Sequence, residues 1–232
     1  MNPQQRSYQK ELLDEDEIPF ADIQQNMREL NIINIWLGGH RITRKGVQSL
    51  LFGQKQIHVC EIGCGGGDNL LAIEKWCKNK GVTVTFTGID IKEECIQFAK
   101  TRTALQGRTK WIVSDYKKVV FEEKPHIIFS SLFCHHFRNE ALITQLQWMK
   151  EQSTIGFFIN DLQRHPMAYY SIKLLTQLFS KSYLVKNDAP LSVQRGFIKR
   201  EWQHLFAKAN ITSYQIQWQW AFRYLITYRH AE

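Results

Sequence analysis

Hydrophobic and polar positions through the middle of the chain follow two alternating periods. Short apolar runs bounded by glycine, proline or aspartate are typical of buried strands, and apolar residues every three to four positions are typical of helices. The pattern predicts strands at residues 56–63, 82–90, 110–115, 125–133 and 153–161. It predicts intervening helices at residues 68–81, 92–105 and 139–150. Such alternation indicates a parallel sheet with right-handed crossovers.

The N-terminal region has a different texture. Residues 1–20 include an acidic run at 14–17 and are expected to lie extended over the surface. Apolar residues at helical spacing then predict a helix over 21–39: Ile23, Met27, Leu30, Ile33 and Leu37. The pair Gly38-Gly39 ends this helix and is expected to act as the hinge of a lid.

The C-terminal third predicts more helix and a final hairpin. Residues 165–180 begin a helix with a proline in its first turn, and 199–210 form another. Residues 187–197 are expected to be a loop. Clean alternation at 213–220, followed by a second apolar run at 221–229, predicts an antiparallel hairpin at the sheet edge.

Together these elements predict an α/β protein of Rossmann-like type. Its seven-stranded sheet is mostly parallel, with an antiparallel edge hairpin. The expected division is an N-terminal extension and lid helix over residues 1–50 and a main domain over 51–232, with a helical insertion at about 162–197.

Composition narrows the setting of the protein. The 232 residues are 44% hydrophobic, enough for one domain with its own core. Five cysteines without a Cys-x-x-Cys pair favour reduced thiols and a cytoplasmic location. No apolar run approaches the roughly 18 residues of a membrane span, so no integral membrane association is expected.

The net charge of +8 is uneven along the chain. Residues 160–232 carry 10 basic and 4 acidic side chains, whereas residues 1–30 carry 3 and 7. A basic C-terminal third could meet nucleic acid, an acidic small molecule or an anionic membrane surface, or could simply be solvated. Charge alone does not choose among them.

The stretch "VCEIGCGGGD" at 59–68 carries the strongest chemical signal. Glycines between a strand and a helix let the backbone approach a ligand beside free N–H groups at the helix N-terminus. The dinucleotide fingerprint needs glycine at its sixth position, where this chain has Asp68. A carboxylate there repels a pyrophosphate but suits a ligand that carries positive charge. A nicotinamide oxidoreductase is therefore disfavoured.

This stretch resembles the glycine motif of class I S-adenosylmethionine-dependent methyltransferases, and the resemblance extends over about residues 56–161. It implies that Asp90, ending the second strand, holds the ribose hydroxyls, and that Asp115 lies near the adenine. Glu61 stands where the family more often has aspartate, and with the loop backbone it would hold the methionine end. The implied cofactor-binding residues are Glu61, Gly63, Cys64, Gly65, Gly67, Asp90, Ile91, Asp115, Tyr116 and Ser130.

The segment after the fourth strand bears on the methyl acceptor. It lacks the Asp/Asn-Pro-Pro-aromatic motif of amino-methylating nucleic-acid enzymes and the Pro-Cys pair of cytosine C5 enzymes, so nucleic acid is not the expected partner. It carries His135 and His136, and "SSLFCHHF" resembles quinone-biosynthesis methyltransferases and their small-molecule relatives. Either histidine could deprotonate or hold a phenol. Alternatively, one caps the next helix and the other orders the loop. No metal is expected, because neighbouring residues rarely converge on one ion.

The segment after the fifth strand resembles a group of bacterial methyltransferases with similar "NDL-x-R" and "DAPLS" elements. In the class I fold this region covers the substrate end. The helical stripe containing Tyr170, Leu174 and Leu178 would wall a hydrophobic acceptor, or would simply pack in the core. Arg164, His165 and Asp188 are expected to hold its polar end.

These inferences predict an S-adenosylmethionine-dependent methyltransferase. Its partner is a small, apolar, phenolic or quinol-like acceptor, with O-methylation slightly favoured over C-methylation. Two alternatives are a nucleic-acid methyltransferase that uses the basic C-terminal third and a cofactor-binding protein without transferase activity. The protein is expected to be a monomer or a homodimer.

Overall fold

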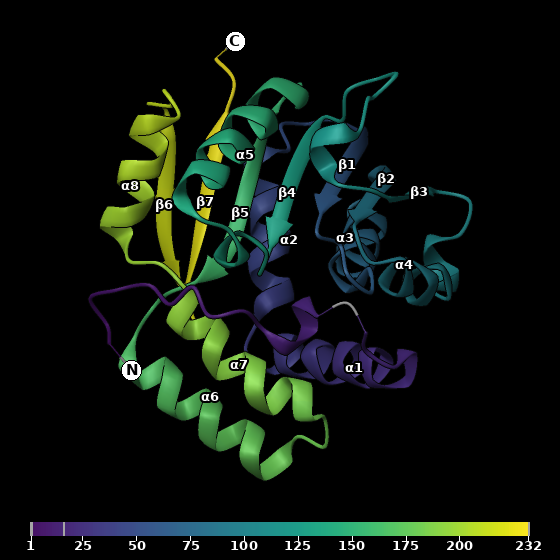
Figure 1. The fold of residues 1–232 in the computed structure, drawn as a ribbon. Coiled ribbons are helices and arrows are strands. Elements are labelled where there is room, and N and C mark those ends of the chain that lie inside the picture. Colours follow the sequence, from purple (N-terminus) through teal and green to yellow (C-terminus); the bar gives the residue numbers. More distant parts are fainter. Residues whose placement is uncertain (1, 16, 232) are drawn as a thin grey trace.

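A computed structural model describes residues 2–15 and 17–231. Its centre is one seven-stranded sheet with the strand order β3-β2-β1-β4-β5-β7-β6 (Figure 1). The strands are β1 Gln56–Ile62, β2 Thr83–Asp90, β3 Thr109–Val113, β4 Ile127–Ser131, β5 Gly156–Leu162, β6 Tyr214–Gln219 and β7 Arg223–Arg229. Strands β1 to β5 are parallel, and β7 is antiparallel to both β5 and β6. The predicted mostly parallel sheet with an antiparallel edge hairpin is confirmed.

Helices cover both faces of the sheet. One face carries α2 Gly39–Leu50 and α3 Asp68–Asn79, whose apolar side chains pack with those of β1 and β2. The other face carries α5 Asn139–Gln152 and α8 Lys199–Lys208. Helix α4 Glu93–Lys100 contacts β2 and β3. The core therefore lies in two layers, and the central strands β1, β4 and β5 are almost wholly buried.

Helix α2 occupies residues for which the sequence predicts no element. Its glycine at position 46 lies against the ring of Phe158, where an added Cβ would come within 2.4 Å. A polar, glycine-containing stretch thus forms a helix because its small residue lets the backbone pack closely on β5. Propensity alone gives no sign of this contact.

Three further helices lie beyond the carboxyl ends of the parallel strands, below the sheet in Figure 1. They are α1 Phe20–Trp36, α6 Pro166–Phe179 and α7 Tyr183–Arg195. The prediction of a loop over 187–197 is wrong, since α7 continues through Pro190 to Arg195. Ser182 caps the start of α7 by accepting a hydrogen bond from the backbone N–H of Val185. The buried apolar residues of α7 offset the hydrogen bond that Pro190 cannot donate.

The sequence predicts that residues 1–20 lie extended over the surface, and the structure shows that two side chains of this segment are nevertheless buried. Arg6 and Glu11 are both buried, and a short 3₁₀ turn, η1, spans Leu12–Asp14. Arg6 donates hydrogen bonds to the backbone carbonyls of Arg195 and Phe137. We call residues 6–15 the strap, because they cross α7 and the turn after β4.

None of the described helices is both long enough and apolar enough to span a bilayer.

Candidate functional site

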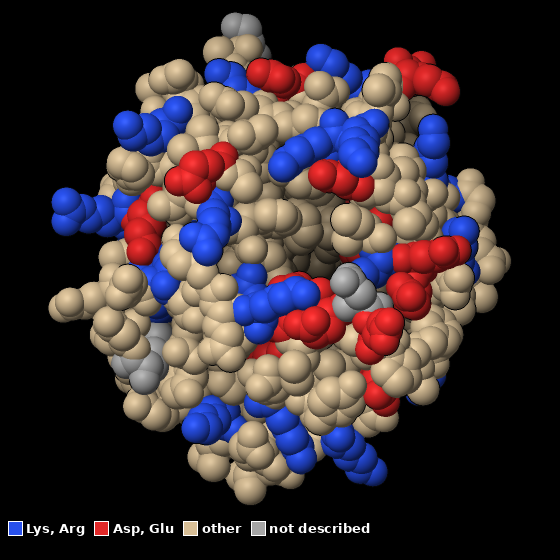
Figure 2. All heavy atoms as spheres, viewed as in Figure 1, with Lys and Arg blue, Asp and Glu red and all other residues tan. Residues whose placement is uncertain are grey.

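A cavity of about 720 Å³ lies at the carboxyl ends of the strands. The chain order reverses there between β2 and β4 on either side of β1, which is where open α/β sheets bind ligands. The strap, α1, α6, α7 and the turn between β6 and β7 complete its walls. Figure 2 shows the molecule hollowed near the centre of one face, with acidic and basic side chains around the hollow.

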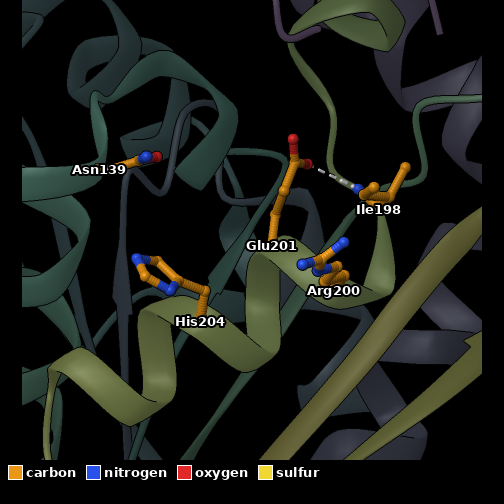
Figure 3. Close-up of a pocket in the computed structure, with 5 residues that line it drawn as sticks. All are labelled: Asn139, Ile198, Arg200, Glu201 and His204. Carbon is orange, nitrogen blue, oxygen red and sulfur yellow. Dashed lines mark hydrogen bonds between the residues drawn. The ribbon is translucent and has the colours of Figure 1, made fainter. Parts of the chain in front are cut away.

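A second, smaller hollow of about 200 Å³ lies at the start of α8 (Figure 3). Five residues line it: Asn139, Ile198, Arg200, Glu201 and His204. The carboxylate of Glu201 accepts the backbone N–H of Ile198 and pairs with Arg164 at 2.7 Å, so its oxygens serve the fold. The larger cavity is the candidate site.

The glycine loop between β1 and α3 forms one wall of the cavity. Gly63, Gly65 and Gly67 all adopt left-handed backbone angles, with φ of 66°, 49° and 71°. A Cβ on Gly63 would come within 2.2 Å of the Phe133 ring, and one on Gly67 within 2.9 Å of Trp111. Gly63 and Gly65 face the cavity, as does the buried thiol residue between them. Gly67 does not line the cavity, and instead begins α3.

Cys64 is the thiol residue between Gly63 and Gly65, and burial raises its pKa well above the usual value. It is therefore a neutral, compact wall residue rather than a thiolate.

Asp90, at the end of β2, fixes the glycine loop and faces the cavity. Its carboxylate accepts the backbone N–H of Gly65 at 2.8 Å and that of Lys92 at 3.0 Å. Burial raises the pKa of Asp90, while these two hydrogen bonds oppose that rise. Ile91 also lines the cavity, and its side chain is largely exposed. These are the positions that the sequence predicts for a ribose-binding acid and an adenine-packing residue.

Glu61, at the end of β1, is a buried carboxylate with one unsatisfied oxygen. Its Oε1 accepts a hydrogen bond from Asn69 at 2.8 Å, whereas its Oε2 has no hydrogen-bond partner among the described residues. Burial raises the pKa of Glu61 well above its usual value. Because a buried carboxylate is costly without a partner, this oxygen suits a ligand that brings an ammonium group or another donor.

Asn69 is a site residue that the sequence did not single out. Its Oδ1 lies 3.1 Å from Nδ1 of His40 and accepts from Thr43 at 3.0 Å. His40 Nε2 lies 2.9 Å from Oδ1 of Asn31 in α1. Asn69 therefore joins the carboxylate of Glu61 to both α1 and α2. Only its position one residue after the motif could have pointed to it.

The predicted adenine side lies at the end of β3. Asp115 and Tyr116 line the cavity, and Asp115 accepts the backbone N–H of Lys117 at 3.0 Å. Ser130, in contrast, does not line the cavity. It is fully buried, with Oγ 3.4 Å from Sγ of Cys134. The structure therefore brings all the predicted cofactor residues to the cavity wall except Ser130 and Gly67.

Asp68 lines the cavity and forms an ion pair with Arg102. Burial raises the pKa of Asp68 to about 6, and the attraction of Arg102 opposes that rise. A pyrophosphate on this helix N-terminus would face this carboxylate.

The two histidines lie in a 3₁₀ turn, η4 Cys134–His136, directly after β4, and both line the cavity. Nδ1 of His135 is 2.8 Å from Oδ1 of Asp161, which ends β5. The other oxygen of Asp161 accepts the backbone N–H of Cys134 at 2.8 Å. Burial alone would raise the pKa of Asp161, but His135 and the backbone N–H of Leu162 hold it below its usual value. An ionised Asp161 thus directs Nδ1–H of His135 inward, so that Nε2 lies on the side of the cavity and of Glu11.

Glu11 of the strap meets both histidines. Its Oε1 lies 3.7 Å from Nε2 of His135 and its Oε2 lies 3.8 Å from Nε2 of His136. Asp14 Oδ1 lies 3.3 Å from Nδ1 of His136. No sequence motif marks this contact, because 124 positions separate Glu11 from His135.

Glu11, His135 and His136 could also hold a metal ion, since their ligand atoms all lie within 4.8 Å of one another. Arg195 already supplies a cation here. Its Nη1 is 3.6 Å from Oε1 of Glu11 and 3.3 Å from Oδ2 of Asp14.

Helices α6 and α7 form another wall of the cavity, on the side where the sequence predicts the acceptor. From α6 it is lined by Ala168, Ser171, Ile172 and Leu175, and from α7 by Ala189, Ser192 and Val193. The stripe that was expected to wall the acceptor points outward instead, with Tyr170 61% and Leu178 65% exposed. Helical spacing identifies which residues share a face, but not which face meets the site.

Three predicted acceptor residues lie off the cavity. Arg164 is buried, paired with Glu201 at 2.7 Å. Asp188 accepts two backbone N–H groups of η1, each at 2.9 Å, and so fastens the strap. His165 accepts the N–H of Met167 and caps α6. All three hold the walls of the cavity in place rather than facing its interior.

Arg223, at the start of β7, does face the cavity, and the sequence did not single it out. Its Nη2 donates to Oδ1 of Asn34 in α1 at 2.9 Å.

A family model described as a methyltransferase domain matches residues 59–177 of this chain. Two demethylmenaquinone methyltransferases, from Staphylococcus aureus strains MRSA252 and JH9, are each 30% identical to it over 104 residues. That stretch covers 45% of this chain and 42% of either relative, so it spans less than half the length of the curated relatives.

Solved structures share the fold over most of the chain. Human N-acetylserotonin methyltransferase in complex with SAM has a TM-score of 0.65 at 18% identity, covering 92% of this chain and 57% of that one. The plantazolicin methyltransferase in complex with SAH has a TM-score of 0.63 at 22% identity, covering 86% and 74%. At these identities the likeness shows the fold alone, and it confirms the predicted class I methyltransferase architecture.

Proposed function

The chain belongs to the methyltransferase-domain family, and from this premise we propose that it methylates a small, apolar, phenolic or quinol-like acceptor. The observation that carries the proposal is that the glycine loop and His135, which is bonded to the buried Asp161, face one cavity. Cofactor residues and a candidate base therefore share a single enclosed space. The protein is an S-adenosylmethionine-dependent methyltransferase, and the finer choice of acceptor is our inference.

The residues on the cofactor side fit S-adenosylmethionine. Glu61 offers an unsatisfied buried oxygen to the amino group of its methionine end, and the bare loop leaves room for the backbone to approach it. Asp90, Ile91 and Asp115 all line the cavity, and in this proposal Asp90 holds the ribose hydroxyls while Ile91 and Asp115 contact the adenine. When bound, the cofactor supplies a methyl group on a positively charged sulfur.

His135 is the base in this proposal. Asp161 holds Nδ1–H, so Nε2 can take the proton of an acceptor hydroxyl and leave the oxygen with a free lone pair. The buried carboxylate of Glu11, 3.7 Å away, would stabilise the imidazolium that forms. O-methylation is favoured over C-methylation because removing one proton from one hydroxyl is sufficient.

The apolar faces of α6 and α7 serve a second purpose. They enclose the acceptor and exclude water from the reacting atoms, which strengthens every charge interaction in the cavity. The strap and α1 close the remaining sides. Met27 of α1 lies within 3.5 Å of where a Cβ on Gly65 would stand.

Transfer of an isotopically labelled methyl group to a panel of phenols, hydroquinones and enols, with RNA and DNA alongside, tests the proposal. We expect phenolic products whose labelled carbon is bonded to oxygen by NMR. His135→Gln should lower kcat by about 10²-fold or more while affinity for S-adenosylhomocysteine stays unchanged. Full activity of that variant, or transfer to nucleic acid only, would contradict the proposal.

We also propose a cytoplasmic location, supported by the five cysteines, all of which are free and buried. A monomer or homodimer is the assembly we expect, to be checked by light scattering.

A further inference from the structure

The guanidinium of Arg223 is buried in the cavity wall without a counter-charge. The residue is 2% exposed, and Nη2 donates to the neutral amide of Asn34. Its Nε and Nη1 have no hydrogen-bond partner among the residues that the structure describes. None of the ion pairs in the described ranges includes it.

Burial of this kind is costly for a cation. It lowers the pKa of Arg223 to about 10, so the side chain is still charged at neutral pH. Asp161 attracts it from a distance, but that carboxylate is already bonded to His135 and to backbone N–H groups. A buried, unpaired cation with free donors fits a site whose ligand supplies the missing anion.

Arg223 lies where β7 meets the wall of the cavity. Arg223 pairs with Leu162 in the sheet, and both residues line the cavity. The side chain reaches the junction of α1 and α2, where a Cβ on Gly39 would come within 2.8 Å of Nη1. Glycine at position 39 therefore lets the guanidinium lie against the start of α2.

The position in the sheet favours one source of the anion. The cofactor residues lie on β1, β2 and β3, whereas β7 is on the far side of β4 and β5. The acceptor therefore occupies the half of the cavity nearer Arg223. The amino-acid end of the cofactor, which the proposal puts beside Glu61 on β1, also carries a carboxylate and is the other source of the anion.

We propose that Arg223 and Asn34 form a subsite for a carboxylate-type anion, carried by the acceptor or by the amino-acid end of the cofactor. The guanidinium donates its free N–H groups to the anionic oxygens, and Asn34 holds the guanidinium in place. For the acceptor source, the inference rests on the proposed function and narrows the acceptor to a phenolic or enolic acid.

Calorimetry on the full chain separates the two sources without requiring methyl transfer. In the cofactor arm, wild type and Arg223→Met are titrated with S-adenosylhomocysteine and with 5′-methylthioadenosine, which lacks the amino-acid part. If the cofactor supplies the anion, the variant should bind the first at least about tenfold more weakly and the second unchanged.

In the acceptor arm, the protein saturated with S-adenosylhomocysteine is titrated with salicylate and with salicylamide, its neutral counterpart. If the acceptor supplies the anion, wild type should prefer salicylate by at least about tenfold, and Arg223→Met should lose that preference. Arg44→Met is the matched control, because Arg44 is exposed on α2 and does not line the cavity.

Thermal unfolding distinguishes a ligand anchor from a structural role. Because Arg223 lacks an internal counter-charge, Arg223→Met should keep or raise the melting temperature, and Arg223→Lys should retain part of the anion preference. Should the Met variant fail to fold, the Lys variant carries both arms. Affinities within twofold of wild type in both arms would overturn the proposal. A failure of the methyl-transfer assay would leave these titrations interpretable.

Discussion

The two halves of the cavity are built in different ways. The cofactor half comes from one continuous stretch, running from Glu61 at the end of β1 to Tyr116 after β3. The acceptor half joins the strap, α1, η4, α6, α7 and the start of β7, so its residues range from Glu11 to Arg223. A local motif specifies the first half, and tertiary packing assembles the second. The residues of the cofactor half could therefore be predicted from their spacing in the sequence. Those of the acceptor half could be predicted only where a sequence motif includes them.

Removing the charge of Asp161 should have the largest effect and tests whether the acceptor half is a catalytic assembly. In Asp161→Asn the amide can present N–H to Nδ1 of His135 and so favour the wrong tautomer. We expect kcat to fall by about 10³-fold, with affinity for S-adenosylhomocysteine retained. Steady-state kinetics and calorimetry measure the two quantities.

Asp161 also accepts backbone N–H groups, so the melting temperature of this variant must be measured alongside. A variant that stays folded and turns over at near wild-type rate would show that the histidine needs no carboxylate partner, and would leave the acceptor half a mere enclosure.

Asp90→Ala tests the cofactor half. The substitution removes the acceptor for the N–H of Gly65 and the carboxylate placed for the ribose. Loss of one charged hydrogen bond and of loop order should weaken S-adenosylhomocysteine binding by about 10- to 100-fold. Asp115→Ala is a useful companion, since Asp115 lines the same half but does not hold the loop. Equal, small losses in both variants would contradict the role given to Asp90.

The same difference between local and distant contacts decides which elements could be predicted from the sequence. The five parallel strands and the glycine loop were predictable, because each is marked by a local signal: an apolar run, a glycine or a strand-ending acid. Helix α2 was not, since its fit depends on Gly46 meeting Phe158 from another strand. Helix α7 was hidden by Pro190, whose local cost is outweighed by buried contacts.

Site residues divide in the same way. Glu61 and Asp90 lie where the motif predicts them. Asn69 and Arg223 carry no motif of their own, and Asp161 lies in the "NDL-x-R" element without a role that the sequence could assign. The importance of all three appears only from partners on other elements. The apolar stripe of α6 was visible in the sequence, but helical spacing does not show which face of the helix meets the cavity.

The pH dependence of cofactor binding sharpens the description of the cofactor half. The pKa of Asp68 is raised from 3.8 to about 6, so the carboxyl is protonated below that pH and ionised above it. A positively charged sulfur nearby favours the ionised form and lowers that pKa when it binds. Affinity for S-adenosylmethionine should therefore be constant above about pH 7 and fall severalfold between pH 6 and pH 5.

S-adenosylhomocysteine, whose sulfur is neutral, provides the control for this effect. Its affinity should change less over the same range, and Asp68→Asn should remove the difference between the two ligands. Parallel pH profiles for both ligands in wild type would show that Asp68 does not sense the charge of the sulfur.

Chelation should have the smallest effect and decides how the acceptor half uses Glu11, His135 and His136. Two imidazoles and a carboxylate within 4.8 Å can bind a divalent ion. However, Oε1 of Glu11 already accepts from Ser192 at 2.8 Å and has the guanidinium of Arg195 3.6 Å away, so its charge is balanced within the chain. A divalent ion here would have to approach that guanidinium, and we propose that none is required.

Prolonged treatment with EDTA should leave turnover within about twofold of the untreated enzyme, since a base needs no Lewis acid to take one phenolic proton. The contrary result would be a loss of activity that a divalent ion restores, with a stoichiometric metal found by elemental analysis. In that case Glu11, His135 and His136 would be metal ligands, and the ion would activate the acceptor in place of Nε2 of His135.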